Sequence, residues 1–363
     1  MSPVKIGFVL LSNSRNPIPS TRIAALNIFP YLRAENLEPH IVFEPEHATE
    51  TPDVSHLATT LIKEGFQIVV FQKVHGPSVE TLARRLSEAG IKTVYSVCDL
   101  INTTMADATD ATLVVSEYLK SQYPTSLQSK IHIVHDGIED PEVCKTSWSD
   151  HAGSRSRPLR AVLVTSVELD RLPHLEAPPE WLAVTIVGRY AAAGQVMQRF
   201  REARWNLARQ QCFHDRLAYL RFLANRRIRC LAWSQATAYE SMQNADIGIL
   251  PIETVPAHLP GNVPPPWKLK SENRLTMKMC VGLPVIATPI PSYEPVIKQG
   301  VNGFFAQSYA DWNKCLGALR DPALRRTMGE RARESVRESY SMENQARRLI
   351  TVLRELVRPH ARR

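Results

Sequence analysis

The feature that most constrains the fold is a rhythm of short apolar runs alternating with longer amphipathic stretches. In the first half, β-branched runs predict strands, and the stretches between them predict helices; the strands are expected at 6–11, 40–43, 68–71, 93–96, 111–115 and 131–134. Such alternation is typical of a parallel sheet covered by helices on both faces. The first half of the chain is therefore expected to be an α/β domain.

The rhythm stops and then begins again. Residues 141–158 are polar and rich in turn formers, which predicts an interdomain linker. From Leu159 the pattern predicts strands at 160–165, 183–187, 228–232, 247–251, 284–287 and 303–306. We therefore expect an N-terminal Rossmann-like domain over 1–140, a C-terminal one over 159–340, and a last helix over 341–363 that crosses back to the first domain. A chain of 363 residues is long enough for two cores.

Two parallel-sheet domains in tandem also predict where a ligand binds. Ligands of open α/β sheets bind beyond the carboxyl ends of the strands. If two such domains face each other, these edges form the walls of a cleft. The informative residues are therefore those in loops that directly follow strands.

Composition excludes several classes of protein. No apolar run reaches the roughly 20 residues that a membrane-spanning helix needs, and the start of the chain predicts a strand rather than a signal peptide. Six cysteines are scattered without a C-x-x-C pair, so reduced thiols are expected rather than a zinc site or a disulfide framework. We expect a cytoplasmic protein, with the inner face of the membrane as a peripheral location.

The positive charge is concentrated in one segment. The formal net charge is +8, and Arg189–Arg229 holds ten arginines against two acids, Glu202 and Asp215. This excess predicts contact with an anionic membrane, with nucleic acid or with a phosphorylated substrate. A solvated helix face is the alternative, because apolar residues recur there at helical spacing.

The strongest local signal is a loop that enters a helix near 271–273. Ser271 and Asn273 are good N-caps, and Gly282 is positioned to end the helix. Free amides at a helix N-terminus bind phosphate, and Lys270 and Arg274 add positive charge beside them. An ordinary capped surface helix remains the alternative.

Longer motifs resemble a known family. The run Gly282-Leu283-Pro284-Val285-Ile286-Ala287-Thr288, followed by Glu294 and by Gly300-Val301-Asn302-Gly303-Phe304, is similar to the C-terminal domain of group 1 (family 4) bacterial glycosyltransferases. The segment 245–251 resembles the strand and loop before their donor-binding motif, and 133–139 the end of their N-terminal domain. The resemblance implies a GT-B fold, with two Rossmann-like parallel-sheet domains facing across a cleft, and sugar transfer from a nucleotide-diphosphate sugar.

One part of the family pattern is missing. The family carries two glutamates, eight positions apart, that contact the donor, and the corresponding positions here are Leu269 and Met277. The chain instead resembles a subgroup with a Lys-Ser-x-Asn-Arg loop. The resemblance then places the diphosphate beside Ser271, Asn273 and Arg274, with Lys270 and Arg274 neutralising the leaving group. Further donor-side candidates are Glu272, Gly188, Trp233, Pro251 and Glu294.

The acceptor side is predicted from loops of the first domain. Asp99 follows a strand where the family often has a histidine-aspartate pair, so it is a candidate to orient an acceptor hydroxyl or take its proton; a capping aspartate is the alternative. Thr21 and Arg22 follow the first strand, and Lys73 and His75 follow the third. These four are candidate acceptor-binding residues.

These observations predict the function. We expect transfer of a sugar from a UDP- or GDP-linked donor to a glycan, a lipid-linked sugar or another hydroxyl, with retention of configuration. The chain has no D-x-D triplet, so we expect no metal and no cofactor, the diphosphate being stabilised by the helix dipole and basic side chains. The alternatives are glycosylation of modified bases in nucleic acid, and a non-catalytic partner of an active transferase.

Overall fold

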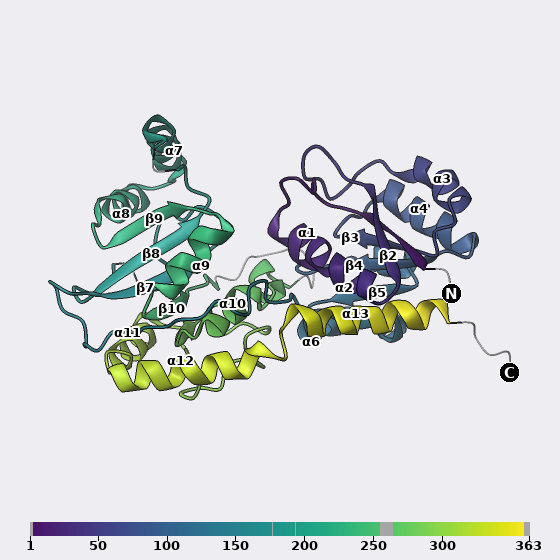
Figure 1. The fold of residues 1–363 in the computed structure, drawn as a ribbon. Coiled ribbons are helices and arrows are strands. Elements are labelled where there is room, and N and C mark those ends of the chain that lie inside the picture. Colours follow the sequence, from purple (N-terminus) through teal and green to yellow (C-terminus); the bar gives the residue numbers. More distant parts are fainter. Residues whose placement is uncertain (1–2, 176, 193, 255–263, 359–363) are drawn as a thin grey trace. The chain divides into compact units, whose positions relative to one another are not determined.

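The computed structural model describes residues 3–175, 177–192, 194–254 and 264–358. Within these ranges the chain divides into two compact units. Of the described residues, unit 1 contains 3–139, 264–273 and 339–358, and unit 2 contains those within 140–254 and 274–338. Each unit holds one six-stranded sheet in which every strand pairing is parallel (Figure 1). The predicted α/β class with two parallel sheets is confirmed.

The sheet of unit 1 has the order β2-β1-β3-β4-β5-β6. Its strands are β1 (Val4–Val9), β2 (Leu37–Phe43), β3 (Ile68–Gln72), β4 (Lys92–Ser96), β5 (Ala111–Val114) and β6 (Ile131–Ile133). The connections contain α1 (Pro19–Ala24), η1 (Leu26–Ile28), α2 (Phe29–Ala34), η2 (Ser55–Leu57), α3 (Ala58–Lys63), α4 (Pro77–Glu88), α5 (Thr103–Ala108), α6 (Glu117–Ser121) and η3 (Thr125–Lys130).

Both faces of the unit 1 sheet are buried, as a parallel sheet requires. Alternate residues of β1 and β3 belong to two separate apolar clusters, with Val9 and Phe71 in one and Phe8 and Ile68 in the other. The second cluster includes six buried apolar residues of α13 (Met342–Val357). Figure 1 shows α13 beside α2, and the two helices are in contact.

The sheet of unit 2 has the order β12-β11-β10-β7-β8-β9. Its strands are β7 (Leu159–Val164), β8 (Leu182–Gly188), β9 (Ile228–Ala232), β10 (Ile247–Leu250), β11 (Val285–Ala287) and β12 (Gly303–Phe305). The helices associated with it are α7 (Val196–Arg209), α8 (Phe213–Ala224), α9 (Gln235–Gln243), α10 (Asn273–Val281), α11 (Tyr309–Ala318) and α12 (Pro322–Arg337), and η4 (Pro266–Leu269) precedes α10. Gly282 ends α10 with a φ of 95°, the left-handed conformation that its position predicted.

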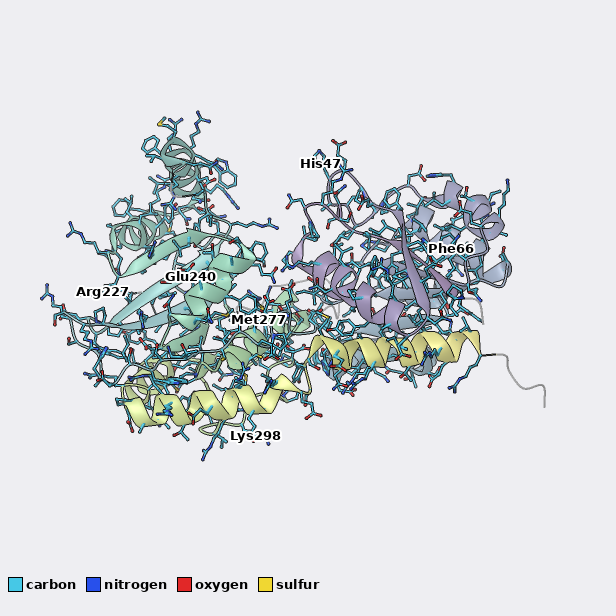
Figure 2. The ribbon with its side chains drawn as sticks, viewed as in Figure 1. His47, Phe66, Arg227, Glu240, Met277 and Lys298 are labelled. Carbon is cyan, nitrogen blue, oxygen red and sulfur yellow. The ribbon has the colours of Figure 1, made fainter. Side chains whose placement is uncertain are left out.

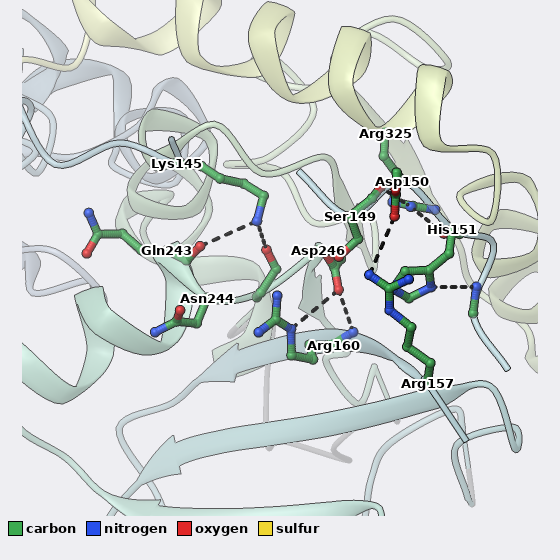
Figure 3. Close-up of polar contacts among 12 residues, drawn as sticks. Lys145, Ser149, Asp150, His151, Arg157, Arg160, Gln243, Asn244, Asp246 and Arg325 are labelled. Atoms are coloured by element: carbon green, nitrogen blue, oxygen red, sulfur yellow. Dashed lines mark hydrogen bonds and ion pairs between the residues drawn. The ribbon is translucent and has the colours of Figure 1, made fainter. Parts of the chain in front are cut away.

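Residues 141–158, which were predicted as a linker, are counted within unit 2 and make polar contacts inside it (Figure 3). The Asp246 carboxylate is 1% exposed and accepts hydrogen bonds from the Ser149 hydroxyl at 2.6 Å and from the Arg160 backbone amide at 2.8 Å. The buried Arg325 guanidinium donates to the carbonyl oxygens of Ser149 and His151. A segment that satisfies buried polar groups in this way is part of the unit's structure.

Candidate functional site

Charged side chains gather at the carboxyl ends of three strands of unit 1. Lys73 follows β3, Cys98 and Asp99 follow β4, and His135 and Asp136 follow β6. A pocket opens at this edge, and Gln72, Ser96, Cys98, His135 and Asp136 are among its lining residues. The loop 270–273, which contains four of the predicted donor-side residues, is also counted within unit 1.

Lys73 and Asp99 form an ion pair at this edge. The Lys73 ammonium lies 2.7 Å from Asp99 Oδ1 and 3.7 Å from Glu50 Oε1. Burial acts to lower the pKa of Lys73, but Cys98, Asp99 and Glu50 outweigh it and raise that pKa. The Lys73 backbone has a φ of 58°, a left-handed conformation that costs free energy for a side-chain-bearing residue. Such strain concentrates at functional sites.

His135 and Glu272 form the second pair. The Nδ1 atom of His135 lies 2.8 Å from the Val115 carbonyl oxygen and 2.9 Å from Glu272 Oε1. Because a carbonyl only accepts, Nδ1 carries the proton, and Nε2 is the nitrogen left for a further contact. The Glu272 side chain is 1% exposed, and its Oε2 atom has no hydrogen-bond partner among the described residues. A buried carboxylate oxygen without a donor is costly, so this atom is a candidate ligand contact.

Asp136 is the residue of this edge whose ionisation is most perturbed. It is nearly buried, and burial raises its pKa to about 7, with Glu272 and Asp99 adding to the effect. A hydrogen bond from Ser271 and the nearby His135 act in the opposite direction. The Cys98 thiol donates to Asp99 Oδ1 at 3.6 Å, and burial raises the pKa of that thiol. A carboxyl that exchanges its proton near neutral pH suits general acid or base chemistry.

Two predicted acceptor-binding residues are engaged inside unit 1. Thr21 is fully buried, and its hydroxyl bonds to Ser12 and Gln72. The Arg22 guanidinium binds both carboxylate oxygens of Glu139, at 2.6 and 2.9 Å. These contacts give Thr21 and Arg22 structural roles in unit 1, and their part in acceptor binding stays a prediction.

His75 is partly exposed beside the same edge. Its Nε2 atom lies 3.7 Å from Glu50 Oε2, the carboxylate that also faces Lys73. The structure therefore links His75 and Lys73 through one acidic side chain, and both remain acceptor-side candidates.

In unit 2, the start of α10 provides the cationic side chain that was predicted for the donor. α10 ends at Gly282 and leads into the amino end of β11, so its first turn lies towards the carboxyl edge of the unit 2 sheet. Arg274 stands in this turn, half-buried, and no acidic side chain of the described residues pairs with it. A guanidinium beside the amino end of a helix is suited to binding an anion.

Lys278 lies one turn further along α10 and was missed from the sequence. Its side chain is fully buried, crosses Gly248 of β10, and donates to the Arg274 carbonyl oxygen at 3.0 Å. Burial and the neighbouring Arg274 lower the pKa of Lys278 to about 7. The only signal of its burial in the sequence was the helical spacing of Lys278 among apolar residues. That signal is weak, because a buried lysine is rare unless it is paired.

The other donor-side candidates lie at the same edge of the unit 2 sheet or in the loop beyond β11. A Cβ on Gly188 would lie 2.7 Å from the Val167 carbonyl oxygen, so this glycine accommodates the protein's own backbone, and its contact with a donor stays a prediction. Trp233 is 37% exposed, and its amide donates to the Gly188 carbonyl. Pro251 is buried after β10, and Glu294 is exposed.

The two positions where the family carries glutamates point into apolar cores. Leu269 is buried in a core cluster of unit 1, and Met277, marked in Figure 2, is buried in a cluster of unit 2. An acid at either position would lose apolar contacts and require a partner. The structure therefore leaves no room for the family's two glutamates at these positions.

Within the part of the chain that the structure describes, no group of three or more His, Cys, Asp and Glu side chains could hold a metal ion. The six cysteines are free thiols. None of the described helices is both long and apolar enough to traverse a bilayer.

Comparison with known proteins identifies the fold. Residues 173–351, just under half of the chain, match the family model described as glycosyl transferase-like. No curated protein matches the sequence. Three solved structures resemble nearly the whole chain at low identity, and this likeness shows a GT-B fold with two six-stranded parallel sheets.

The first of these structures is Alr3699/HepE of Anabaena in complex with UDP and glucose, with 14% identity, a TM-score of 0.63, and coverage of 97% of this chain and 100% of the other. The second is a glycosyltransferase of Rickettsia africae, with 13% identity, a TM-score of 0.67, and coverage of 99% and 100%. The third is sucrose-phosphate synthase of Thermosynechococcus elongatus, with 12% identity, a TM-score of 0.63, and coverage of 97% and 98%.

Proposed function

We propose that this chain transfers a sugar from a nucleotide-diphosphate sugar to an acceptor hydroxyl. The observation that carries the proposal is the match of residues 173–351 to the glycosyl transferase-like family, which includes α10 and the strands beside it. The Anabaena neighbour was solved with UDP-glucose, which favours a UDP-linked donor over a GDP-linked one.

The donor is proposed to bind through the first turn of α10. The amides of this turn and the Arg274 guanidinium would bind the diphosphate, and Lys270 and Ser271 immediately precede it in the chain. Positive charge placed before the reaction stabilises the diphosphate as it departs, without a metal ion. We propose that Trp233, half-exposed after β9, contacts the base.

The acceptor is proposed to bind at the charged edge of unit 1. The Asp99 carboxylate, held by Lys73, would orient a hydroxyl group, and Nε2 of His135 would contact the same molecule. Asp136 can hold a proton at neutral pH because burial raises its pKa to about 7. A retaining transfer to a glycan or a lipid-linked sugar is proposed from the family resemblance.

A thermal-shift screen of the full chain tests the donor site. UDP, GDP, ADP, CMP and dTDP are compared with their common sugar conjugates, and a ligand at one hundred times its Kd should stabilise the protein by about 2.7 kcal/mol. We expect a response to UDP and UDP-sugars. The absence of a thermal shift with every nucleotide would refute the proposed donor.

Substitution of Arg274 tests the site itself. Arg274→Ala should abolish the UDP response and lower donor turnover, followed as UDP release, by about 100-fold, because a charge contact to the leaving group is lost. Arg331→Ala on α12 removes an exposed arginine and is the matched control. Turnover that is equal in the two variants would rule out this assignment.

A non-catalytic partner of an active transferase is the second candidate. Its support is that the two positions of the family's glutamates are filled by the buried Leu269 and Met277. The same assays separate the two functions, since a partner protein would bind the nucleotide but release no UDP from UDP-sugars, with or without acceptor.

A further inference from the structure

Helices α7 and α8 expose an unusual amount of apolar surface. Seven large apolar side chains of this segment are exposed, and Phe213 at 80%, Phe200 at 62% and Trp205 at 60% are the aromatic ones. The other four are Val196, Met197, Leu220 and Leu223. No residue of α7 is buried. In Figure 1, α7 lies at the end of unit 2 opposite α11 and α12.

The exposed apolar residues share a face with arginines. One side of α7 carries Met197, Arg201, Arg204 and Trp205. These residues are three or four positions apart, or adjacent, and therefore lie on the same side of the helix. The half-buried residues Arg199, Glu202, Asn206 and Leu207 occupy the other side. The outer side of α7 is therefore both apolar and cationic.

The arginines of this face lack acidic partners in the part of the chain that the structure describes. Among the described residues, no arginine of α7 or α8 forms an ion pair with an acid, whereas Arg227 beyond them pairs with Glu180. Glu202 accepts from the backbone amide of Ala191 and from Gln198, and Asp215 accepts from Cys212 at the start of α8. The two acids of the segment are thus engaged locally.

We propose that the outer face of α7 and α8 binds the surface of an anionic lipid bilayer. Helices that lie in a membrane interface combine apolar and aromatic side chains, which enter the acyl region, with basic side chains that bind the headgroups. Arginine suits this arrangement because its stem covers apolar surface while its guanidinium reaches the headgroups. The proposal is independent of the transferase reaction.

Two other occupants fit the face less well. Nucleic acid would bind arginines and stack on aromatic rings, but Val196, Met197, Leu220 and Leu223 offer no ring on which a base can stack. A second copy of the chain would bring two arginine-rich faces together, and like charges in contact oppose association. An anionic bilayer satisfies both the charge and the apolar surface.

The test is co-sedimentation of the full chain with vesicles of phosphatidylcholine containing 30% phosphatidylglycerol, compared with phosphatidylcholine alone. We expect binding to the anionic vesicles at 100 mM salt, and binding at least tenfold weaker to the neutral ones or at 500 mM salt, because salt screens surface charge. Absence of binding to the anionic vesicles would overturn the proposal.

Two variants separate the apolar and the charged contributions. Phe200→Ser with Trp205→Ser should weaken vesicle binding at least tenfold, whereas Ile62→Ser, which removes an exposed apolar residue of α3, should not. Arg201→Gln with Arg204→Gln should also weaken it at least tenfold, since each arginine near an anionic surface contributes strongly. Arg326→Gln with Arg331→Gln on α12 removes the same charge and should have no comparable effect.

Further measurements check that the variants fold and which partner the face binds. Circular dichroism should be unchanged in the variants, because none of the replaced side chains is buried. Quenching of tryptophan fluorescence by brominated lipids should fall in Trp205→Phe if this ring enters the acyl region. Binding to DNA that the same variants abolish, without vesicle binding, would reassign the face to nucleic acid. A dimer that the variants dissociate would reassign it to self-association.

Discussion

Replacing the buried Lys278 with methionine should stabilise unit 2, and the gain should depend on pH. The side chain is fully buried between α10 and β10, and its ammonium has one hydrogen bond, to the Arg274 carbonyl. Its pKa falls from 10.5 to about 7 in the folded chain. Because the folded state holds this proton less tightly than the unfolded state, the charged amine lowers stability at neutral and acidic pH.

The size of the effect follows from these two pKa values. A difference of one unit between the two pKa values corresponds to 1.36 kcal/mol, so the lowered pKa of Lys278 reduces the free energy of unfolding by about 5 kcal/mol at pH 6, about 3 kcal/mol at pH 8 and about 1 kcal/mol at pH 10. Methionine has a similar length and no charge, and loss of the hydrogen bond offsets about 1 kcal/mol at every pH. The gain in unfolding free energy should therefore be about 4 kcal/mol larger at pH 6 than at pH 10.

Urea unfolding at pH 6, 8 and 10 measures this difference. Intrinsic fluorescence suits the assay, because Trp148, Trp181, Trp205, Trp233 and Trp312 all lie in unit 2. Lys298→Met, at the exposed lysine labelled in Figure 2, is the control and should leave stability unchanged within about 0.5 kcal/mol. A gain of equal size at pH 6 and pH 10, or a loss at pH 6, would show that charge burial is not the cause.

Three further predictions concern stability. Asp136→Asn should stabilise the chain by about 2 to 4 kcal/mol above pH 7 and by little at pH 4, because burial raises the pKa of this carboxyl from 3.8 to about 7 and ionisation is unfavourable in the fold; thermal melting across this range measures it, and a gain confined to pH 4 would contradict it. Gly188→Ala should cost about 1 to 3 kcal/mol in urea unfolding, since its Cβ would meet a backbone carbonyl at 2.7 Å, whereas Gly194→Ala, with open space around it, should be near neutral; equal effects would disprove the packing argument. Glu139→Ala should cost about 3 kcal/mol by circular dichroism, because it removes the buried carboxylate that binds the Arg22 guanidinium, and a cost under about 1 kcal/mol would count against that role.

Much of the architecture could be predicted from the sequence because the signals are local. Alternating runs predicted two parallel sheets, and both exist in the structure. Gly282 was predicted to end a helix, and it takes the left-handed conformation there. The arginine-rich segment, in which apolar residues recur at helical spacing, contains two helices, α7 and α8, separated by residues 210–212. Such breaks depend on packing as well as on periodicity.

The candidate site depended on the tertiary structure. Asp99 and Lys73 were predicted individually, but their ion pair arises because β3 and β4 are neighbours in the sheet. His135 and Glu272 are 137 positions apart, so no local pattern could relate them. The perturbed pKa values of Asp136 and Lys278 come from burial, which the chain acquires only when distant segments pack around these groups.

The sequence by itself determined the repeating strands and helices, the cap at Gly282 and the arginine excess of residues 189–229, because each depends on neighbours along the chain. The tertiary structure decided which of those residues are engaged inside the protein and which are left for contacts outside it. It turned Arg22 towards Glu139, placed the backbone of Val167 against Gly188, and left the arginines of α7 without an acidic partner among the described residues, beside exposed aromatic rings. Burial and pairing are properties of the packed chain, since they require groups that are distant in sequence to meet.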